Sequence, residues 1–177
     1  RGLASVVAAR EAGAGKIIVT GLAADSNKLQ MALALGADHI IDVQNENVVD
    51  RVRALTNGKG ADVIVEVTSY ATQPVREALD CVRMGGTVVL AGVKGFKPVS
   101  DFVSDLIVMK EITIKGAIGV TSSGYKKAIE MIERRKYPLE LMHTHNFELE
   151  EAELAIKTLA RQIEGQESVH SCLIPAT

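Results

Sequence analysis

The chain has 177 residues, of which 47% are apolar and 24% are charged, and its formal net charge is -2. This length suits one domain with a substantial core, and the near-neutral charge without basic runs argues against nucleic-acid binding. Apolar runs such as 87–93 are far shorter than a bilayer span, and no basic-then-apolar leader opens the chain. We expect a cytoplasmic protein with no nucleic-acid or membrane partner.

The two cysteines, Cys81 and Cys172, are far apart in the sequence, and neither belongs to a C-x-x-C motif. This pattern is typical of reduced thiols rather than of a disulfide or a metal site. We expect both thiols to be buried.

The opening residues predict a helix over 2–14 that leads into a buried strand. In a dinucleotide-binding unit, such a helix follows a G-x-G-x-x-G turn, whose last glycine faces the cofactor pyrophosphate at the helix N-terminus. Gly2 fits this last glycine, with the other glycines and their strand outside this chain. A glycine that only packs before an Ala-rich helix is the alternative.

Apolar runs alternate with helical patterns along the rest of the chain. Residues of these runs are apolar at successive positions, which is typical of parallel strands covered on both faces. Together with the intervening helices, they predict an α/β fold with a doubly wound parallel sheet. The expected strands are residues 17–20, 39–43, 62–67, 87–92 and 112–118.

Helical spacing of apolar residues predicts the helices between and after these strands. The three early helices cover 29–35, 48–55 and 75–82, and 168–174 forms a final extended segment. A later helix, which ends before Pro138, carries one apolar stripe of Tyr125, Ala128, Ile129 and Ile132. The last helix, around 150–163, is expected to bury Ala152, Ala155, Ile156 and Leu159.

Four segments match motifs of a known family in order and spacing. Residues 28–42 resemble its (K/R)LxxAxxLGADxxI(D/N), residues 60–67 its GADVVIE, residues 83–92 its xxxGGxxVxxG, and residues 144–152 its THxFxLEEA. The family is that of the medium-chain dehydrogenases, which includes zinc-dependent alcohol, sorbitol and threonine dehydrogenases. Nearly the whole chain resembles their cofactor-binding domain.

This resemblance implies a Rossmann domain over 1–163, truncated at its N-terminus, and a segment, 164–177, that returns towards a catalytic domain not contained in this chain. Family members are about twice as long, and their N-terminal domain supplies the zinc ligands and the proton relay. The first strand of the nucleotide fold is also missing, which would leave the strands at Ile17 and Val63 without a common neighbour.

The implied activity is zinc-assisted hydride transfer between a small-molecule alcohol or polyol and NAD or NADP. The zinc is expected only in the missing domain, so this chain alone would be inactive. The alternatives are a zinc-free quinone reductase of the same superfamily, a non-catalytic nucleotide-binding module and, more remotely, a methyltransferase sheet.

Cofactor contacts are expected at the first helix and at the carboxyl ends of the strands, where open α/β sheets bind their ligands. Residues 91–93 and 118–120 align with family backbone that contacts the nicotinamide, although simple strand-end turns also explain them. No residue of this chain is expected to be catalytic or to bind metal. The expected contacts are Gly2, Gly21, Leu22, Asp25, Lys28, Asp42, Val67, Thr68, Ala91, Gly92, Val93, Ile118, Gly119 and Val120.

The end of the second strand of the nucleotide fold selects between NAD and NADP, because an acid there binds the ribose hydroxyls and repels a 2′-phosphate. Many relatives have Asp at this point, whereas this chain has Gly21. Asp25 replaces the acid, favouring NAD, or merely caps the next helix, which leaves Lys28 to favour a phosphate. We prefer NAD slightly.

Three further residues invite a catalytic interpretation. His143 and His145 stand two positions apart, but no carboxylate or thiol lies at ligand spacing, so we expect structural hydrogen bonds. Glu66 ends a strand as a general base could, yet it occupies a sheet position of the family and is expected to be structural.

The strand at Ile112–Ile118 would form the edge of the sheet, and a long apolar edge requires cover. Relatives join two such edges across a dimer axis. The resemblance therefore predicts a homo-oligomer through this strand.

Overall fold

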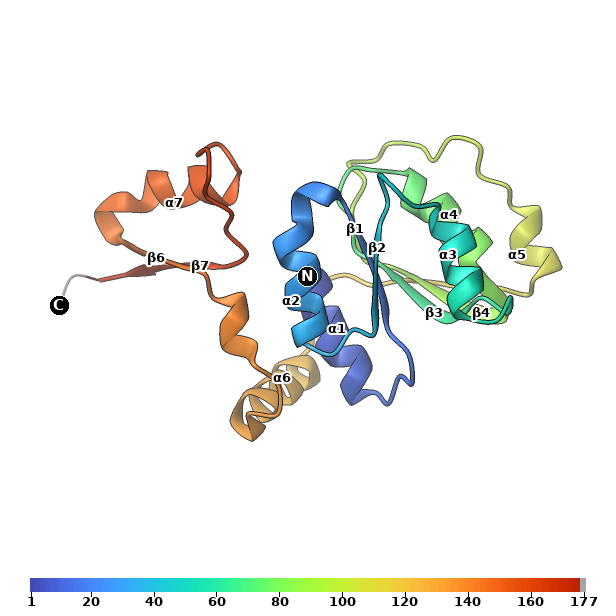
Figure 1. The fold of residues 1–177 in the computed structure, drawn as a ribbon, viewed down its shortest axis with the longest axis horizontal. Helices are drawn as coiled ribbons and strands as arrows, with labels where there is room; N and C mark the ends of the chain where they lie inside the picture. The colour runs from blue at the N-terminus through green and yellow to red at the C-terminus, as the bar shows by residue number, and fades with distance from the viewer. Residues whose placement is uncertain (176–177) are drawn as a thin grey trace.

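The structure is a computed structural model that describes residues 1–175, in which helices and strands alternate (Figure 1). None of the helices in this range is both long and apolar enough to span a membrane. The strands are β1 (Ile18–Gly21), β2 (His39–Asp42), β3 (Ala61–Glu66), β4 (Val82–Leu90), β5 (Thr113–Gly116), β6 (His145–Glu148) and β7 (Ser171–Ile174). The α-helices are α1 (Gly2–Glu11), α2 (Ser26–Ala34), α3 (Val48–Leu55), α4 (Gln73–Cys81), α5 (Asp105–Met109), α6 (Ser122–Arg134) and α7 (Ala152–Leu159).

All strand pairs within residues 1–175 are parallel. β1 pairs with β2, β3, β4 and β5 form a second sheet in that order, and β6 pairs with β7. The predicted α/β class with parallel pairing is confirmed. β1 and β3 belong to different sheets, so these two strands lack a common neighbour in the described chain, as expected.

A buried cluster joins the first two sheets. Ile41 of β2, Val52 of α3 and Cys81 of α4 pack together and contact Ile18 of β1 and Ile64 of β3. Helices α1 and α2 lie on one side of β1 and β2, and α3 and α4 lie on the other (Figure 1). Helices on both faces explain why these strands are apolar at successive positions.

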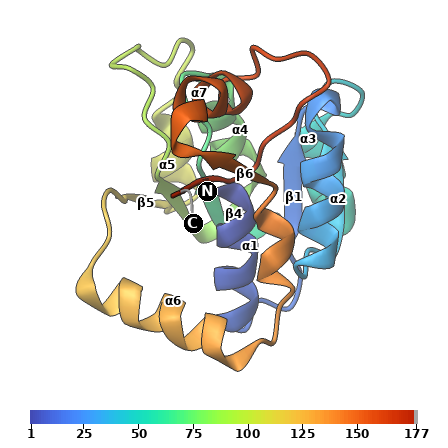
Figure 2. The same ribbon diagram turned by 90° about the vertical axis from the view of Figure 1, so that its left-hand side faces the viewer.

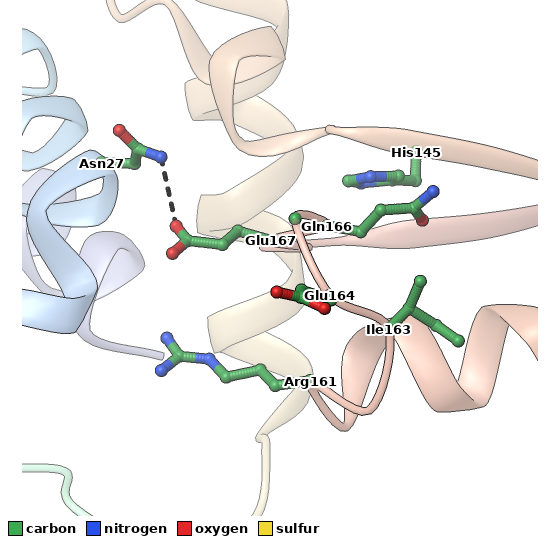
Figure 3. A pocket seen from close by; sticks show the side chains of 8 residues that line it. Asn27, His145, Arg161, Ile163, Glu164, Gln166 and Glu167 are labelled. Carbon is green, nitrogen blue, oxygen red and sulfur yellow. Dashed lines mark hydrogen bonds between the residues drawn. The ribbon is translucent and has the colours of Figure 1, made fainter.

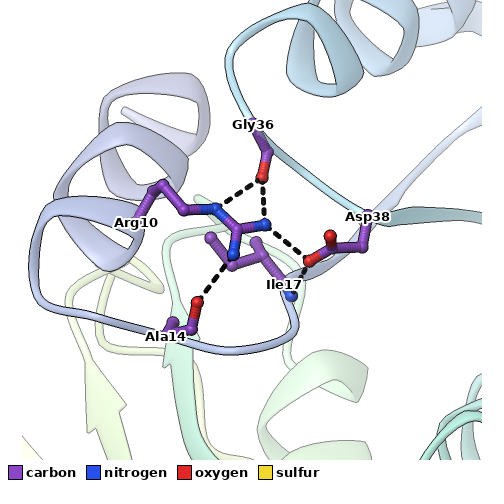
Figure 4. A network of polar contacts seen from close by, with 5 residues as sticks. All are labelled: Arg10, Ala14, Ile17, Gly36 and Asp38. Carbon is purple, nitrogen blue, oxygen red and sulfur yellow. Dashed lines mark hydrogen bonds and ion pairs between the residues drawn. The ribbon is translucent and has the colours of Figure 1, made fainter. Parts of the chain in front are cut away.

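Arg10, near the C-terminal end of α1, ties together three segments (Figure 4). Its guanidinium donates to the carbonyls of Gly36 and Ala14, each at 2.7 Å, and pairs with Asp38 Oδ2 at 2.7 Å. The same Asp38 oxygen accepts the Ile17 amide at 2.6 Å. Gly36 has φ +110°, a backbone conformation that favours glycine. The network therefore gives a structural reason for the Gly and Asp of the LGAD motif.

The observed strands depart most from the prediction at β4 and β6. β4 begins at Val82 and includes Gly85 and Gly86, which precede the predicted start of this strand at residue 87. The register with β3 shifts there, as in a bulge. β6 was not predicted, because Phe147 is the only apolar residue among its four. Its partner β7 lies in the segment predicted to be extended, and residues 176–177 of the predicted terminal segment 164–177 lie outside the described residues.

The predicted apolar stripe lies on α6, but it is exposed in the described chain. Tyr125, Ala128, Ile129 and Ile132 all face solvent. The helix instead packs through Met131 against the core under α1 and α2, and Figure 2 shows it extending away from the sheets. Helical spacing identified an amphipathic helix but not what would cover it.

The buried face of α7 is narrower than predicted. Ala155 is buried as expected, whereas Ile156 and Leu159 are exposed and Thr158 is buried. The helix packs on the two-stranded sheet of β6 and β7, which is wide enough to cover only one stripe.

The two cysteines differ in environment. Cys81 is buried as predicted, and burial, assisted by the nearby charges of Glu77 and Asp80, raises the pKa of its thiol to about 11. Cys172 is only half-buried, which corrects the expectation for this residue. Its position on a strand of the narrow β6–β7 sheet explains the difference.

The Arg10 network predicts a pH-dependent stability. The Ile17 amide and Arg10 outweigh partial burial and hold the pKa of Asp38 below its usual value. We expect Asp38→Asn to lower the free energy of unfolding by about 1–2 kcal/mol at about pH 7. Because the pKa of Asp38 is lower in the folded state, its carboxylate stabilises the fold at pH values above the unfolded-state pKa of about 3.9. This stabilisation is lost as the pH falls through the folded-state pKa.

Urea denaturation over this pH range measures the effect. The difference between wild type and variant should shrink towards about pH 3. Asp101→Asn, which removes an exposed pair with Arg76, is the control and should change stability by less than about 0.5 kcal/mol. A difference for Asp38→Asn that does not vary with pH would contradict the expectation.

Candidate functional site

The carboxyl ends of the parallel strands meet in two groups. Gly21 of β1 is in register with Asp42 of β2, and Glu66, Leu90 and Gly116 are in register across β3, β4 and β5. Most predicted contacts therefore lie on the loops that follow these ends. Those of the first group are Gly21, Leu22 and Asp42, and those of the second are Val67, Thr68, Ala91, Gly92, Val93, Ile118, Gly119 and Val120.

The N-terminus of α1 reaches the second group. A Cβ added to Gly2 would lie 3.8 Å from Val67 Cγ2, so the first residue of the helix touches the loop after β3. In the described chain, no side chain caps the first turn of this helix. The first amides of the helix thus lie beside the loop after β3.

Glu66 holds the end of β3 to the loop after β4. Its buried carboxylate pairs with Lys94 Nζ at 2.7 Å and accepts the Thr68 amide at 2.8 Å, while its carbonyl accepts the amides of Ala91 (2.8 Å) and Gly92 (3.0 Å). Lys94 also donates to the carbonyl of Thr68. Both carboxylate oxygens are engaged, which supports the structural role expected for Glu66 over that of a free base.

The loops after β3 and β4 approach too closely for any side chain at Gly92. A Cβ built on Gly92 would overlap the backbone carbonyl of Thr68. Tyr70 also donates its amide to the carbonyl of Val93 at 3.1 Å. This contact requires glycine at position 92 and holds the two loops side by side.

Two other predicted contacts also have structural partners. A Cβ on Gly21 would lie 2.9 Å from Leu29 Cδ2, so the glycine admits the buried leucine of α2. The carboxylate of Asp42 accepts the Gln44 amide at 3.0 Å and the Asn45 side chain at 2.7 Å, which shapes the turn after β2. Gln44 in turn accepts the amide of Ala23 at 3.0 Å, so the loops after β1 and β2 are joined.

Asp25 is the acid nearest the end of β1, and it does not cap α2. It stands at the N-cap position, but its side chain makes no capping hydrogen bond. Instead it pairs with Lys28 at 3.2 Å and with Arg161 of the C-terminal segment. Partial burial alone would raise the pKa of Asp25, but Lys28 and Arg161 outweigh it and lower that pKa. One carboxylate is thus held between two cations.

A cavity of about 690 Å³ opens beside this ion pair (Figure 3). It lies between the first turn of α2 and residues 161–167, and Asn27 donates to Glu167 Oε2 at 3.1 Å across it. Its volume is within the range of small-molecule sites. The lining residues are Asn27, His145, Arg161, Ile163, Glu164, Gly165, Gln166 and Glu167.

The residues after β5 are the least enclosed of the predicted contacts. Ile118 is 94% exposed, and Gly119 and Val120 are exposed as well. The amide of Ala117, which donates to the carbonyl of Leu90 at 2.9 Å, links this segment to the neighbouring strand end.

Sequence reasoning missed Lys94 and Arg161. Lys94 follows the strand-end glycine closely, and this spacing was a usable signal. Arg161 is far from Asp25 in sequence and gave none. The structure also brings Cys172 to His143 and His170, the one group of three potential metal ligands among the described residues, although the sequence shows no thiol close to His143.

Comparison with known proteins agrees with this arrangement. The family model described as zinc-binding dehydrogenase matches residues 2–134. A probable alcohol dehydrogenase of Mycobacterium tuberculosis is 37% identical over 179 residues, which cover 99% of this chain and 48% of that protein. A sorbitol dehydrogenase of Halalkalibacterium halodurans is 29% identical over 137 residues, covering 77% of this chain and 39% of that protein.

An alcohol dehydrogenase from Thermotoga maritima, known from its crystal structure, matches with a TM-score of 0.85 at 29% identity, covering 98% of this chain and 47% of that chain. The chain thus spans about half the length, or less, of the relatives it matches.

The close contact at Gly92 predicts that Gly92→Ala lowers the free energy of unfolding by about 1–3 kcal/mol, because the new methyl group overlaps the Thr68 backbone. Gly116→Ala is the matched control: it also changes a glycine at the end of a strand, but its Cβ would have nothing within 4 Å. Urea denaturation compares the two variants. Equal stability of both would show that the loops separate freely.

Proposed function

The chain belongs to the zinc-binding dehydrogenase family, and on this basis we propose that it binds a nicotinamide dinucleotide as part of an oxidoreductase. The reaction is hydride transfer between an alcohol or polyol and the cofactor. The relatives described above, an alcohol and a sorbitol dehydrogenase, support this substrate class.

One observation carries the proposal: the N-terminus of α1 lies against the loop at the end of β3. A helix N-terminus attracts the negative charge of a pyrophosphate through its free amides and its dipole. Gly2 leaves room there because it has no side chain. We assign the pyrophosphate to this helix end, as the residue pattern of a dinucleotide fold requires.

The bound nicotinamide supplies the hydride chemistry, and the chain contributes position. Glu66, Lys94 and Gly92 hold the loops after β3 and β4 together, so the backbone of 91–93 is fixed beside the ring. The residues of 118–120 complete this end. We expect the zinc ligands and the proton relay on a part of the protein outside these residues.

The adenosine end lies, in this proposal, beside Asp25. Its carboxylate accepts hydrogen bonds from the ribose hydroxyls and opposes a 2′-phosphate, which favours NAD. The flanking Lys28 and Arg161 would favour the phosphate once Asp25 lost its charge. The cytoplasmic location expected from the sequence stays a prediction.

Fluorescence titration with NADH and NADPH tests the proposal. We expect the protein to bind NADH, and Asp25→Asn to weaken NADH binding about tenfold while strengthening NADPH binding, because a charged acceptor is removed and two cations are freed. Asp62→Asn, which breaks a similar pair with Arg83 at 2.6 Å, is the control and should change neither affinity.

Two results would contradict the proposal at different points. A protein that binds S-adenosylmethionine and neither dinucleotide is not a dehydrogenase. Equal loss of NADH and NADPH binding in Asp25→Asn would remove the preference for NAD but leave dinucleotide binding in place.

We also propose a homo-oligomer through the edge of the second sheet. Among the described strands, β5 pairs only with β4, and all four of its residues are exposed. Ile118 and Val120 continue this exposed edge as apolar residues. A free parallel edge with apolar neighbours is a surface that pairing would cover.

Multi-angle light scattering measures the oligomeric state. We expect at least a dimer for the wild type and a shift to monomer for Ile118→Asp, which adds a charge to the edge. Val108→Asp changes an exposed apolar residue of α5 and is the control. A monomeric wild type would end the proposal.

A further inference from the structure

Three side chains that ligate metals gather where β6 and β7 begin. His143 follows the 3-10 turn Leu139–Met142, His170 immediately precedes β7, and Cys172 lies within β7. Their ligand atoms all lie within 4.8 Å of one another. His170 and Cys172 are two positions apart on an extended segment, so their side chains share one face.

The two imidazoles stand at the separation of metal ligands. His143 Nδ1 and His170 Nδ1 are 3.1 Å apart. Two nitrogens at about 2.0–2.1 Å from a tetrahedral Zn²⁺ are about 3.3 Å apart. The distance between these two nitrogens is therefore close to the one that a shared ion requires.

Asn146 determines which ring nitrogen of the neutral His143 side chain carries the hydrogen. Its Oδ1 lies 2.7 Å from His143 Nε2, and an amide oxygen accepts hydrogen bonds but does not donate them. His143 Nε2 therefore carries the proton, and Nδ1 keeps a lone pair directed at His170. Ligating histidines are held in this way, by an acceptor on the second ring nitrogen. Asn146 is in register with Cys172, so strand pairing fixes this positioning residue.

We propose that His143, His170 and Cys172 bind one Zn²⁺, with water in the fourth position. On binding, the Cys172 thiol releases its proton to solvent and ligates as the thiolate, and each histidine contributes a neutral Nδ1. Two imidazoles and one thiolate favour Zn²⁺ over the oxygen-binding Mg²⁺ and Ca²⁺. The exposed histidines and the half-buried thiol leave the ion a path from solvent.

The chain also supplies its own controls. His145 lies between the ligands in sequence but is occupied elsewhere: its Nδ1 lies 2.9 Å from Thr144 Oγ1, and its ring stacks on Phe147. Cys81 is buried with a raised pKa of about 11, so it competes neither for metal nor for thiol reagents. Loss of signal in a variant of the three ligands is therefore specific.

Titration of the metal-stripped protein with Co²⁺, which reports thiolate ligation by near-ultraviolet charge transfer, tests the site. We expect wild type to bind one equivalent more than Cys172→Ser, and the charge-transfer band to be absent from that variant. His143→Gln and His170→Gln should bind at least about tenfold more weakly, and Asn146→Ala about 10–100-fold more weakly. His145→Gln should behave as wild type.

A second readout needs no spectroscopy of the metal. Zn²⁺ should slow the reaction of Cys172 with a thiol reagent at least tenfold in wild type and in His145→Gln, but not in His143→Gln. Circular dichroism confirms that each variant is folded. Equal metal stoichiometry in wild type and Cys172→Ser, or no protection of the thiol by Zn²⁺, would overturn the proposal.

Discussion

Helix α1 is fixed at its C-terminal end, and the rest of the site depends on this. At its C-terminal end, Arg10 binds the carbonyl of Gly36 and the carboxylate of Asp38, which in turn holds the amide of Ile17. These partners lie where β1 and β2 begin. A helix of this length extends about 15 Å, so its other end reaches the opposite edge, where the parallel strands end. The network at one edge therefore determines where Gly2 meets the strand loops at the other.

The sequence predicted this half of the molecule well because its signals are local. Strands covered on both faces are apolar at successive positions, and glycines mark their ends. The same reasoning predicted the apolar stripe of α6 but not its exposure, because spacing reveals a stripe and not what covers it. It also failed for the partners of Asp25, since Arg161 joins from a distant segment. Likewise, nothing in the order of residues shows that Cys172 lies beside His143.

The C-terminal segment is joined to α2 by polar contacts. Arg161 reaches Asp25, and Glu167 accepts from Asn27. The three buried apolar clusters of the described residues contain no member of β6, α7 or β7. Contacts between exposed charges are weak and respond to salt. The side of the cavity formed by residues 161–167 is therefore easier to displace than the side formed by α2.

The small sheet of β6 and β7 also needs more than its own strands to be stable, because two short parallel strands are marginal in water. Hydrogen bonds supply part of this: Ser168 Oγ lies 2.7 Å from Ser171 Oγ, and Thr144 Oγ1 donates to the carbonyl of His170 at 3.1 Å. The first bond shapes the turn before β7, and the second joins the start of β6 to the start of β7. His143, His170 and Cys172 lie at this same junction, where an ion would add a cross-link between segments far apart in sequence. Because the sheet of β6 and β7 belongs to none of the buried apolar clusters, a cross-link at the point where its two strands begin would add the most to its stability.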